Sequence, residues 1–80
     1  MINVLFFGQL REQLKIDKLS LDTVPNVKDL KILLAQRGVM WQEILSSDST
    51  LVAVNQTISS DQTTLCDGDE IAFFPPVTGG

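Results

Sequence analysis

The sequence predicts an α+β fold in which a mixed sheet carries one main helix across one face. Short β-rich segments flank one clear amphipathic helix, in the order strand, strand, helix, shorter strands and a final strand. The 80 residues, 44% hydrophobic and 20% charged, are enough for one compact core. No linker interrupts the chain before residue 75. We therefore expect one folded body, residues 1–74, followed by an extended tail, residues 75–80.

The first strand is expected over residues 2–7 (INVLFF), which are rich in β-forming side chains. Gly8 ends this strand. A short helix is predicted over 9–15, where two leucines lie one helical turn apart. Residues 18–24 alternate between apolar and polar side chains, which indicates an amphipathic second strand.

The main helix is predicted over residues 27–37. Asn26 is suited to cap it, because an Asn side-chain oxygen can accept a hydrogen bond from the first turn of amide groups. Gly38 is expected to end the helix in the left-handed conformation that glycine adopts without steric cost. Helical spacing predicts a buried face made of Val27, Leu30, Leu33 and Leu34.

The second half of the chain is expected to contain a short helix over 40–46 and three strands. Two of these strands, 50–54 and 57–58, are joined by an Asn-Gln turn, and the last strand covers 70–74. The β-grasp is the best-known fold with this order of elements. Its usual arrangement places the first and last strands side by side in parallel.

Side-chain alternation divides the first and last strands between two faces of the sheet. The helix is expected to cover the uniformly apolar face, which the sequence assigns to Ile2, Val4, Phe6, Ile71 and Phe73. Asn3 and Glu70 mark the opposite face as reaching solvent. Phe7 and Phe74 fall on that outer face, and Ile58 is expected to join them. Exposed apolar side chains of this kind indicate a surface that binds a protein partner.

The final residues have the composition of an extended arm. Two consecutive prolines fix φ and remove two backbone donors, so the last strand ends and the chain leaves the body. The next two residues are stiff because they are β-branched, and the two glycines have no Cβ that would obstruct a narrow channel. The arm is therefore predicted to enter a partner through Pro75, Pro76, Val77, Thr78, Gly79 and Gly80.

Gly80 offers the reactive group, a terminal carboxylate that no side chain shields. This carboxylate is ionised at neutral pH, because its pKa is about 3.5, and it is then a poor electrophile. Another enzyme must activate it, most simply as an acyl-adenylate. The activated carbonyl can pass to a lysine, which gives a protein conjugate, or to sulfur, which gives a thiocarboxylate.

The rest of the chain offers no catalytic arrangement. It contains no histidine, which excludes Ser-His-Asp and Cys-His mechanisms. Cys66, the one cysteine, has acidic neighbours that disfavour its thiolate, and we expect it to be a small packed residue. No metal site is expected, and no glycine-rich phosphate loop is present.

Charge and hydropathy limit the classes of partner. The net charge of −4 argues against binding to a phosphate backbone and suits docking onto a basic protein. No stretch approaches the ~20 apolar residues of a membrane span, and the opening segment lacks the basic leader of a signal peptide. We therefore expect a cytoplasmic protein with no nucleic-acid or membrane partner.

The chain resembles the family of molybdopterin synthase small subunits, which are ubiquitin-like sulfur carriers. The resemblance rests on INVLFFGQLRE near the start, VAVNQT in the middle and DGDEIAFFPPVTGG at the end. It implies a sulfur-donating subunit without catalytic groups of its own, whose active site lies on the large subunit. It also implies that a ubiquitin-activating-like adenylyltransferase, using ATP and Mg, adenylates Gly80. A sulfur donor system then forms the thiocarboxylate, and this chain itself binds no cofactor.

By the same resemblance, the tail inserts into the large subunit, where its sulfur enters cyclic pyranopterin monophosphate to build the dithiolene of molybdopterin. Two small and two large subunits are expected to form a heterotetramer. Phe7, Ile58 and Phe74 match positions expected to contact the large subunit. Two alternatives stay open: the sulfur carrier of thiamine biosynthesis, and a ubiquitin-like modifier that is joined to lysines.

Overall fold

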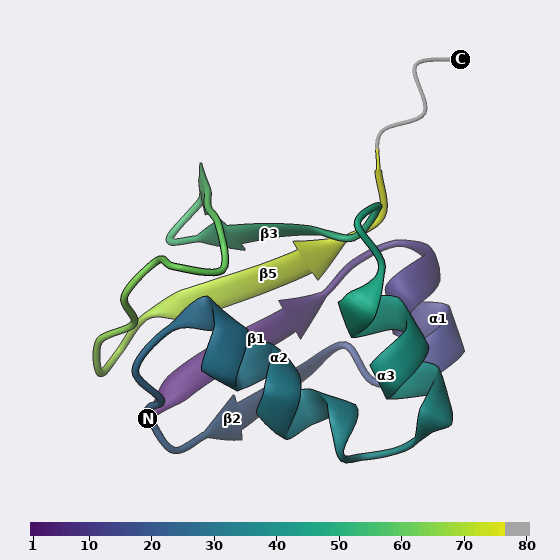
Figure 1. Cartoon of the computed structure of the whole chain (residues 1–80), viewed down its shortest axis with the longest axis horizontal. Coiled ribbons are helices and arrows are strands. Elements are labelled where there is room, and N and C mark those ends of the chain that lie inside the picture. Colours follow the sequence, from purple (N-terminus) through teal and green to yellow (C-terminus); the bar gives the residue numbers. More distant parts are fainter. Residues whose placement is uncertain (77–80) are drawn as a thin grey trace.

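Two segments from opposite ends of the sequence pair in parallel at the centre of a five-stranded sheet. The computed structural model describes residues 1–76 and orders the strands β2-β1-β5-β3-β4 (Figure 1). Only the β1–β5 pair is parallel; the other three pairs are antiparallel. The elements are β1 (Ile2–Phe6), α1 (Gln9–Leu14), β2 (Lys18–Leu21), α2 (Val27–Ala35), α3 (Val39–Ser46), β3 (Leu51–Val54), β4 (Thr57–Ile58) and β5 (Glu70–Phe74). The expected α+β, β-grasp arrangement is confirmed.

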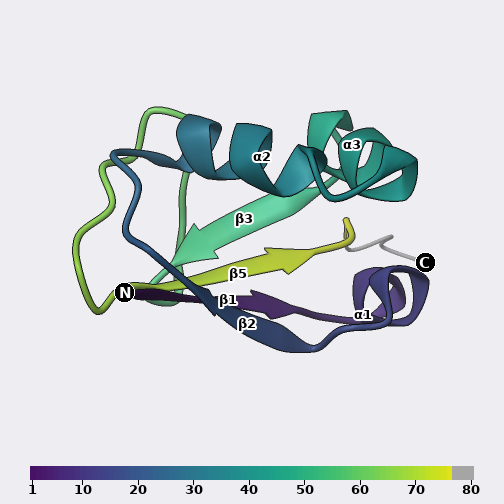
Figure 2. The same cartoon turned by 90° about the horizontal axis from the view of Figure 1, so that it is seen from below.

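The helices α2 and α3 lie on one side of the sheet, and α1 lies at the end where β5 stops (Figure 2). The expected inner face is confirmed, because all five side chains that the sequence assigns to it are buried. The Phe6 ring stacks on Phe73 at a centroid distance of 5.9 Å and lies perpendicular to the Trp41 ring at 5.3 Å. These ring contacts pack the two central strands, β1 and β5, against α3.

The start of α2 follows the prediction, whereas its end does not. The Asn26 side-chain oxygen accepts a hydrogen bond from the Asp29 N–H at 2.8 Å. The helix stops at Ala35, and Gly38 is extended (φ 161°, ψ 172°) rather than left-handed. The expected left-handed stop was wrong because Gly38 leads directly into α3, and its carbonyl oxygen accepts the Gln42 N–H at 3.0 Å.

The predicted buried face of α2 is correct for three of its four members. Val27, Leu30 and Leu34 are buried, but Leu33 is 40% exposed. At about 100° per residue, Leu33 lies roughly 60° beyond Leu30, outside the arc that the three buried side chains span. It therefore borders the core instead of joining it.

The remaining predicted elements are present with small differences in their bounds. Asn55 and Gln56 both have positive φ, 50° and 70°, as a two-residue hairpin turn between β3 and β4 requires. The second strand ends at Leu21, not at residue 24, because Leu21 already pairs with Ile2, the first residue of β1. None of the helices within residues 1–76 has the length and hydropathy that a membrane span requires.

Candidate functional site

The face of the sheet opposite α2 and α3 carries an apolar row that crosses four strands. Strand pairing aligns Leu5 of β1 with Ala72 of β5. Ala72 in turn pairs with Ala53 of β3, which pairs with Ile58 on the edge strand β4. Because directly paired residues point to the same side of a sheet, these four side chains form one row on the outer face.

Phe7 and Phe74 lie on this face at the end of the sheet from which the chain continues past β5. Phe74 pairs with Leu51 of β3. The Phe7 N–H donates to the Phe73 carbonyl oxygen at 3.1 Å, so the β1–β5 ladder extends one residue beyond β1. Alternation then keeps both rings on the outer face, as expected. Phe7 is 47% exposed, and Phe74 is half-buried.

The two outer phenylalanines do not form an aromatic pair. Within residues 1–76, the aromatic ring contacts are those centred on the buried Phe6, so Phe7 and Phe74 have no stacking or edge contact between them. Ile58 is 65% exposed and lies on the same face, but it is separated from β5 by β3. Large apolar side chains that remain this accessible are typical of a protein–protein interface.

The other end of the outer face is negatively charged. A hydrogen bond from the N-terminal ammonium group is the main cause that lowers the pKa of Asp67 below its ordinary value. The Asn55 side-chain amide, which donates to Asp69 at 2.9 Å, and the Cys66 N–H likewise lower the pKa of Asp69. Both carboxyl groups are therefore ionised at neutral pH, close to the first residue of β5, Glu70. A partner that covers the whole face would meet apolar side chains near the tail. At the far end it would meet carboxylates, of which Asp67 is already paired with the N-terminal ammonium group.

Pro75, the first residue of the tail, lies against the turn between β1 and α1. Pro75 follows β5 directly and is half-buried, whereas Pro76 is exposed. A Cβ built on Gly8, in the turn between β1 and α1, would lie 3.2 Å from the Pro75 Cγ. Both prolines also line a groove of about 290 Å³ between α1 and α3. The predicted tail residues Val77, Thr78, Gly79 and Gly80 lie outside the described residues.

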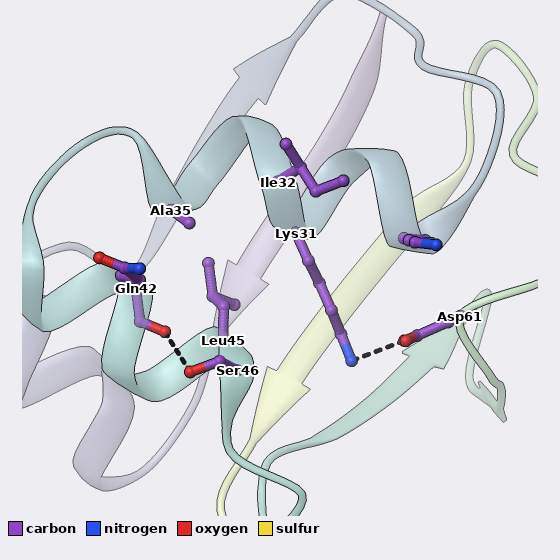
Figure 3. Close-up of a pocket in the computed structure, with 8 residues that line it drawn as sticks. Lys31, Ile32, Ala35, Gln42, Leu45, Ser46 and Asp61 are labelled. Atoms are coloured by element: carbon purple, nitrogen blue, oxygen red, sulfur yellow. Dashed lines mark hydrogen bonds and ion pairs between the residues drawn. The ribbon is translucent and has the colours of Figure 1, made fainter.

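A second groove, of about 210 Å³, lies between α2 and α3, on the helical side of the molecule (Figure 3). Its lining includes Ile32 and Leu45, with the Lys31 ammonium group 2.7 Å from the Asp61 carboxylate. The Ser46 hydroxyl donates to the Gln42 carbonyl oxygen at 2.7 Å. Lys31 is therefore paired with Asp61, and the Ser46 hydroxyl donates its proton to a carbonyl oxygen rather than to a base that could activate it.

Cys66 and possible metal ligands are the other groups in the described part of the chain that could be reactive. Cys66 is exposed, not packed as expected, because it lies in the turn that precedes β5. Residues 1–76 contain no group of three His, Cys, Asp or Glu side chains placed to hold a metal ion. The geometry of residues 1–76 therefore supports binding to a partner.

Sequence reasoning located the aromatic part of the outer surface but not the part contributed by β3. Leu51 and Ala53 belong to the apolar face, yet the strand is apolar throughout, and alternation cannot tell which face such a strand presents. Only the pairing register supplies this information. The groove beside Pro75 and Pro76 had no signal in the sequence, because it forms where α1 and α3 approach each other.

Comparison with known proteins gives a consistent result. The ThiS family model matches residues 4–80. The chain is 46% identical over 81 residues to the molybdopterin synthase sulfur carrier subunit of Haemophilus influenzae, and the match covers 100% of both chains.

Two solved structures support the same fold. One is a chain of the protein–protein complex of subunits 1 and 2 of molybdopterin-converting factor from Helicobacter pylori, with a TM-score of 0.70 and 29% identity over 99% of this chain and 97% of that chain. The other is the small archaeal modifier protein 1 of Methanosarcina acetivorans, with a TM-score of 0.82 and 25% identity over 99% and 95% of the two chains.

Proposed function

Because this chain belongs to the ThiS family, we propose that it is the sulfur carrier subunit of molybdopterin synthase and acts in molybdenum cofactor biosynthesis. The observation that carries this function is the 46% identity to a carrier subunit of that synthase over the full length of both chains. The β-grasp fold and the exposed apolar face agree with a protein that works by docking onto others.

The reactive group in this proposal is the carboxylate of Gly80. An adenylyltransferase joins it to AMP at the expense of ATP, with Mg²⁺ as the metal ion, and releases pyrophosphate. A sulfur nucleophile from a donor system then displaces AMP, which leaves a thiocarboxylate. Gly79 and Gly80 have no Cβ, so the end of the chain can pass through a channel that would exclude any larger residue. Since activation consumes ATP, we expect the carrier to act in the cytoplasm.

The outer apolar face is the proposed docking surface for the large subunit. Phe7, Phe74 and Ile58 provide its accessible apolar side chains. The Helicobacter pylori structure, a complex of subunits 1 and 2 of molybdopterin-converting factor, supports a partner of this kind. Pro75 to Thr78 would then lead into the active site of the large subunit, and two copies of each subunit would form a heterotetramer.

Catalytic groups for sulfur transfer must come from the large subunit. The chain contains no histidine, the Ser46 hydroxyl donates to a backbone carbonyl oxygen, and the Lys31 ammonium group is paired with Asp61. When the thiocarboxylate sulfur attacks cyclic pyranopterin monophosphate, Gly80 and the pterin become joined through a thioester. Water then hydrolyses the acyl C–S bond, which leaves the sulfur on the pterin and restores the Gly80 carboxylate. The carrier can then be activated again to supply the second sulfur of the dithiolene.

A reconstituted reaction tests this function. The full chain, with a chemically prepared thiocarboxylate at Gly80, is mixed with the large subunit and cyclic pyranopterin monophosphate. We expect molybdopterin to form and the carrier mass to fall by the difference between one sulfur and one oxygen atom. The carboxylate form is the control and should give no product. Absence of product from the thiocarboxylate form, despite a stable complex, would contradict the proposal.

A second candidate function is protein modification, favoured by the likeness to the small archaeal modifier protein 1 of Methanosarcina acetivorans. In that case the activated Gly80 carbonyl would pass to a lysine amine. Intact masses after incubation with the activating enzyme separate the two outcomes. A thiocarboxylate changes the mass of the free carrier only slightly, whereas conjugation gives an adduct larger by the whole target protein.

A further inference from the structure

The groove of about 290 Å³ between α1 and α3 lies beside the point where the chain leaves the sheet. The two helices flank the end of β5 (Figure 2). Gln9 and Gln13, four residues apart in α1, line one wall of the groove. Met40 and Glu43, three residues apart in α3, line the other. Residues at these spacings share one face of a helix, so each helix turns a defined set of side chains toward the groove.

The polar side chains of this groove lack partners within the described chain. Glu43 is the one charged residue among the described residues that line it. Its side chain is exposed and forms no ion pair within residues 1–76. The side-chain amides of Gln9 and Gln13 are exposed too. A partner that covered these groups without replacing their water would pay a desolvation cost, so the groove favours a cation with several N–H donors.

The remaining lining suits the apolar stem of a long side chain. Met40 is 48% exposed, Pro75 is half-buried and Pro76 is exposed. An arginine lays its methylene groups along apolar surface, while its planar guanidinium group offers five N–H donors. A carboxylate such as that of Glu43 can accept two of these donors in parallel. Arginine therefore matches both the apolar and the polar parts of the groove.

The groove is continuous with the proposed docking surface around one end of the sheet. Phe74 directly precedes Pro75, and Phe7 lies two residues before Gln9. The Leu10 N–H donates to the Phe7 carbonyl oxygen at 3.2 Å, which ties the start of α1 to the end of β1. A partner that covers both outer phenylalanines is therefore within reach of the groove.

We propose that the groove between α1 and α3 is a second contact site for the large subunit, and that it receives an arginine side chain of that partner, paired with Glu43. This inference rests on the proposed function, because that function identifies the partner. The outer face supplies apolar contacts on one side of the tail root, and Glu43 supplies a charged contact on the other. A charged contact beside an apolar one fixes the orientation in which the two proteins dock.

Glu43→Gln tests the charged contact, because it removes the charge and keeps the shape of the side chain. Asp22→Asn is the matched control: Asp22 is also exposed, but it follows β2 at the end of the sheet away from the tail. Isothermal titration calorimetry with the large subunit measures both. We expect Glu43→Gln to raise the Kd about fivefold or more, and Asp22→Asn by less than about twofold. An unchanged Kd for Glu43→Gln, or equal increases in the two variants, would overturn the inference.

Charge reversal tests the sign of the group that the groove receives. Glu43→Lys should raise the Kd further than Glu43→Gln, because it places a like charge beside the arginine. Asp22→Lys is the control for the change in net charge and should have a smaller effect. A Kd for Glu43→Lys no higher than that for Glu43→Gln would contradict a cationic occupant.

NMR of the labelled full chain locates the contact without sulfur chemistry. The side-chain NH₂ signals of Gln9 and Gln13 should shift when the large subunit is added. Gln42 is the internal control, because it lines the other groove, between α2 and α3, and its signals should stay in place. Unmoved Gln9 and Gln13 signals in a complex that forms would overturn the inference.

Failure of this inference is distinguishable from failure of the proposed function. If the wild-type complex forms with the expected Glu43 dependence but transfers no sulfur, the proposed function fails and the groove contact stands. If sulfur transfer is normal and Glu43→Gln binds like the wild type, only the inference fails. A loss of affinity for the activating enzyme alone would assign the groove to that enzyme and would also overturn the inference.

Discussion

Phe6 and Phe73 have a different environment from Phe7 and Phe74, although each pair comes from the same ends of the same two strands. The Phe6 and Phe73 rings are buried and stack at 5.9 Å. Their sequence neighbours lie on the outer face, where Phe7 is 47% exposed. One step along a strand reverses the face that a side chain occupies. In this molecule, parity alone therefore separates the aromatic residues that hold the fold from those available to a partner.

The largest expected effect is the loss of folding stability caused by Phe73→Ala, a substitution on the buried face. Loss of a fully buried ring beside Phe6 should lower the free energy of unfolding by about 3–5 kcal/mol, because a cavity remains in a small core. Urea unfolding followed by circular dichroism measures the change. Phe7→Ala is the matched variant from the outer face and should cost less than about 1 kcal/mol. Equal losses in the two variants would contradict the assignment of the faces.

Substitution of Phe7 or Phe74 on the outer face should affect binding to the large subunit rather than stability. Phe7→Ala and Phe74→Ala are each expected to weaken binding to the large subunit by about 1–3 kcal/mol, as large interface side chains do. Isothermal titration calorimetry measures this affinity. Val39→Ala, which shortens a 71%-exposed apolar residue at the start of α3, is the control and should bind normally. Unchanged affinity in both phenylalanine variants would remove the outer face as the docking surface.

A smaller effect is expected from weakening the helix that covers the inner face. Asn26→Ala removes the oxygen that accepts the Asp29 N–H and should lower the free energy of unfolding by about 1 kcal/mol. Thermal or urea unfolding gives this value. Affinity for the large subunit should not change, since α2 lies on the opposite side of the sheet. A change in affinity without a change in stability would contradict the separation of the two faces.

The smallest expected effect concerns the negative end of the outer face. Asn55→Gly keeps the positive φ of the turn but removes the amide that donates to Asp69, so the pKa of Asp69 should rise toward its ordinary value. A lowered pKa in the folded state stabilises the fold above the unfolded pKa, and this contribution disappears as pH falls through the folded pKa. The variant should therefore lose less stability than the wild type on acidification below about pH 4. Carboxyl-carbon NMR titration measures the pKa, with Asp67 as the internal control; an unshifted Asp69 would show that the Asn55 amide does not lower this pKa.

Local patterns predicted most of the fold correctly. Alternation assigned every buried residue of β1 and β5, and the Asn26 cap placed the start of α2. The errors arose where tertiary context decides between local options. Leu33 has helical spacing that suits the core, yet it falls outside the buried arc and is 40% exposed. Gly38 is extended because another helix follows at once.

The candidate site was predictable only in the part that depends on side-chain parity. Phe7 and Phe74 follow from alternation, and their outer position is confirmed. Ile58 lies on the same face through its pairing with Ala53, which alternation did not predict. The contact between Gly8 and Pro75 joins residues 67 positions apart, and a sequence contains no local signal for such an approach. The roles of the last four residues remain predictions, because they lie outside the described part of the chain.

The most direct test of the central claim is sulfur transfer by a chain that lacks Gly80 and carries its thiocarboxylate on Gly79. The reactive carbon would then lie about 3.5 Å short of its normal position, with the same chemistry and the same docking surface. We predict that this chain binds the large subunit normally but forms molybdopterin at less than about 1% of the full-length rate. A near-normal rate would show that Gly80 is not the required sulfur-bearing residue and would contradict the account.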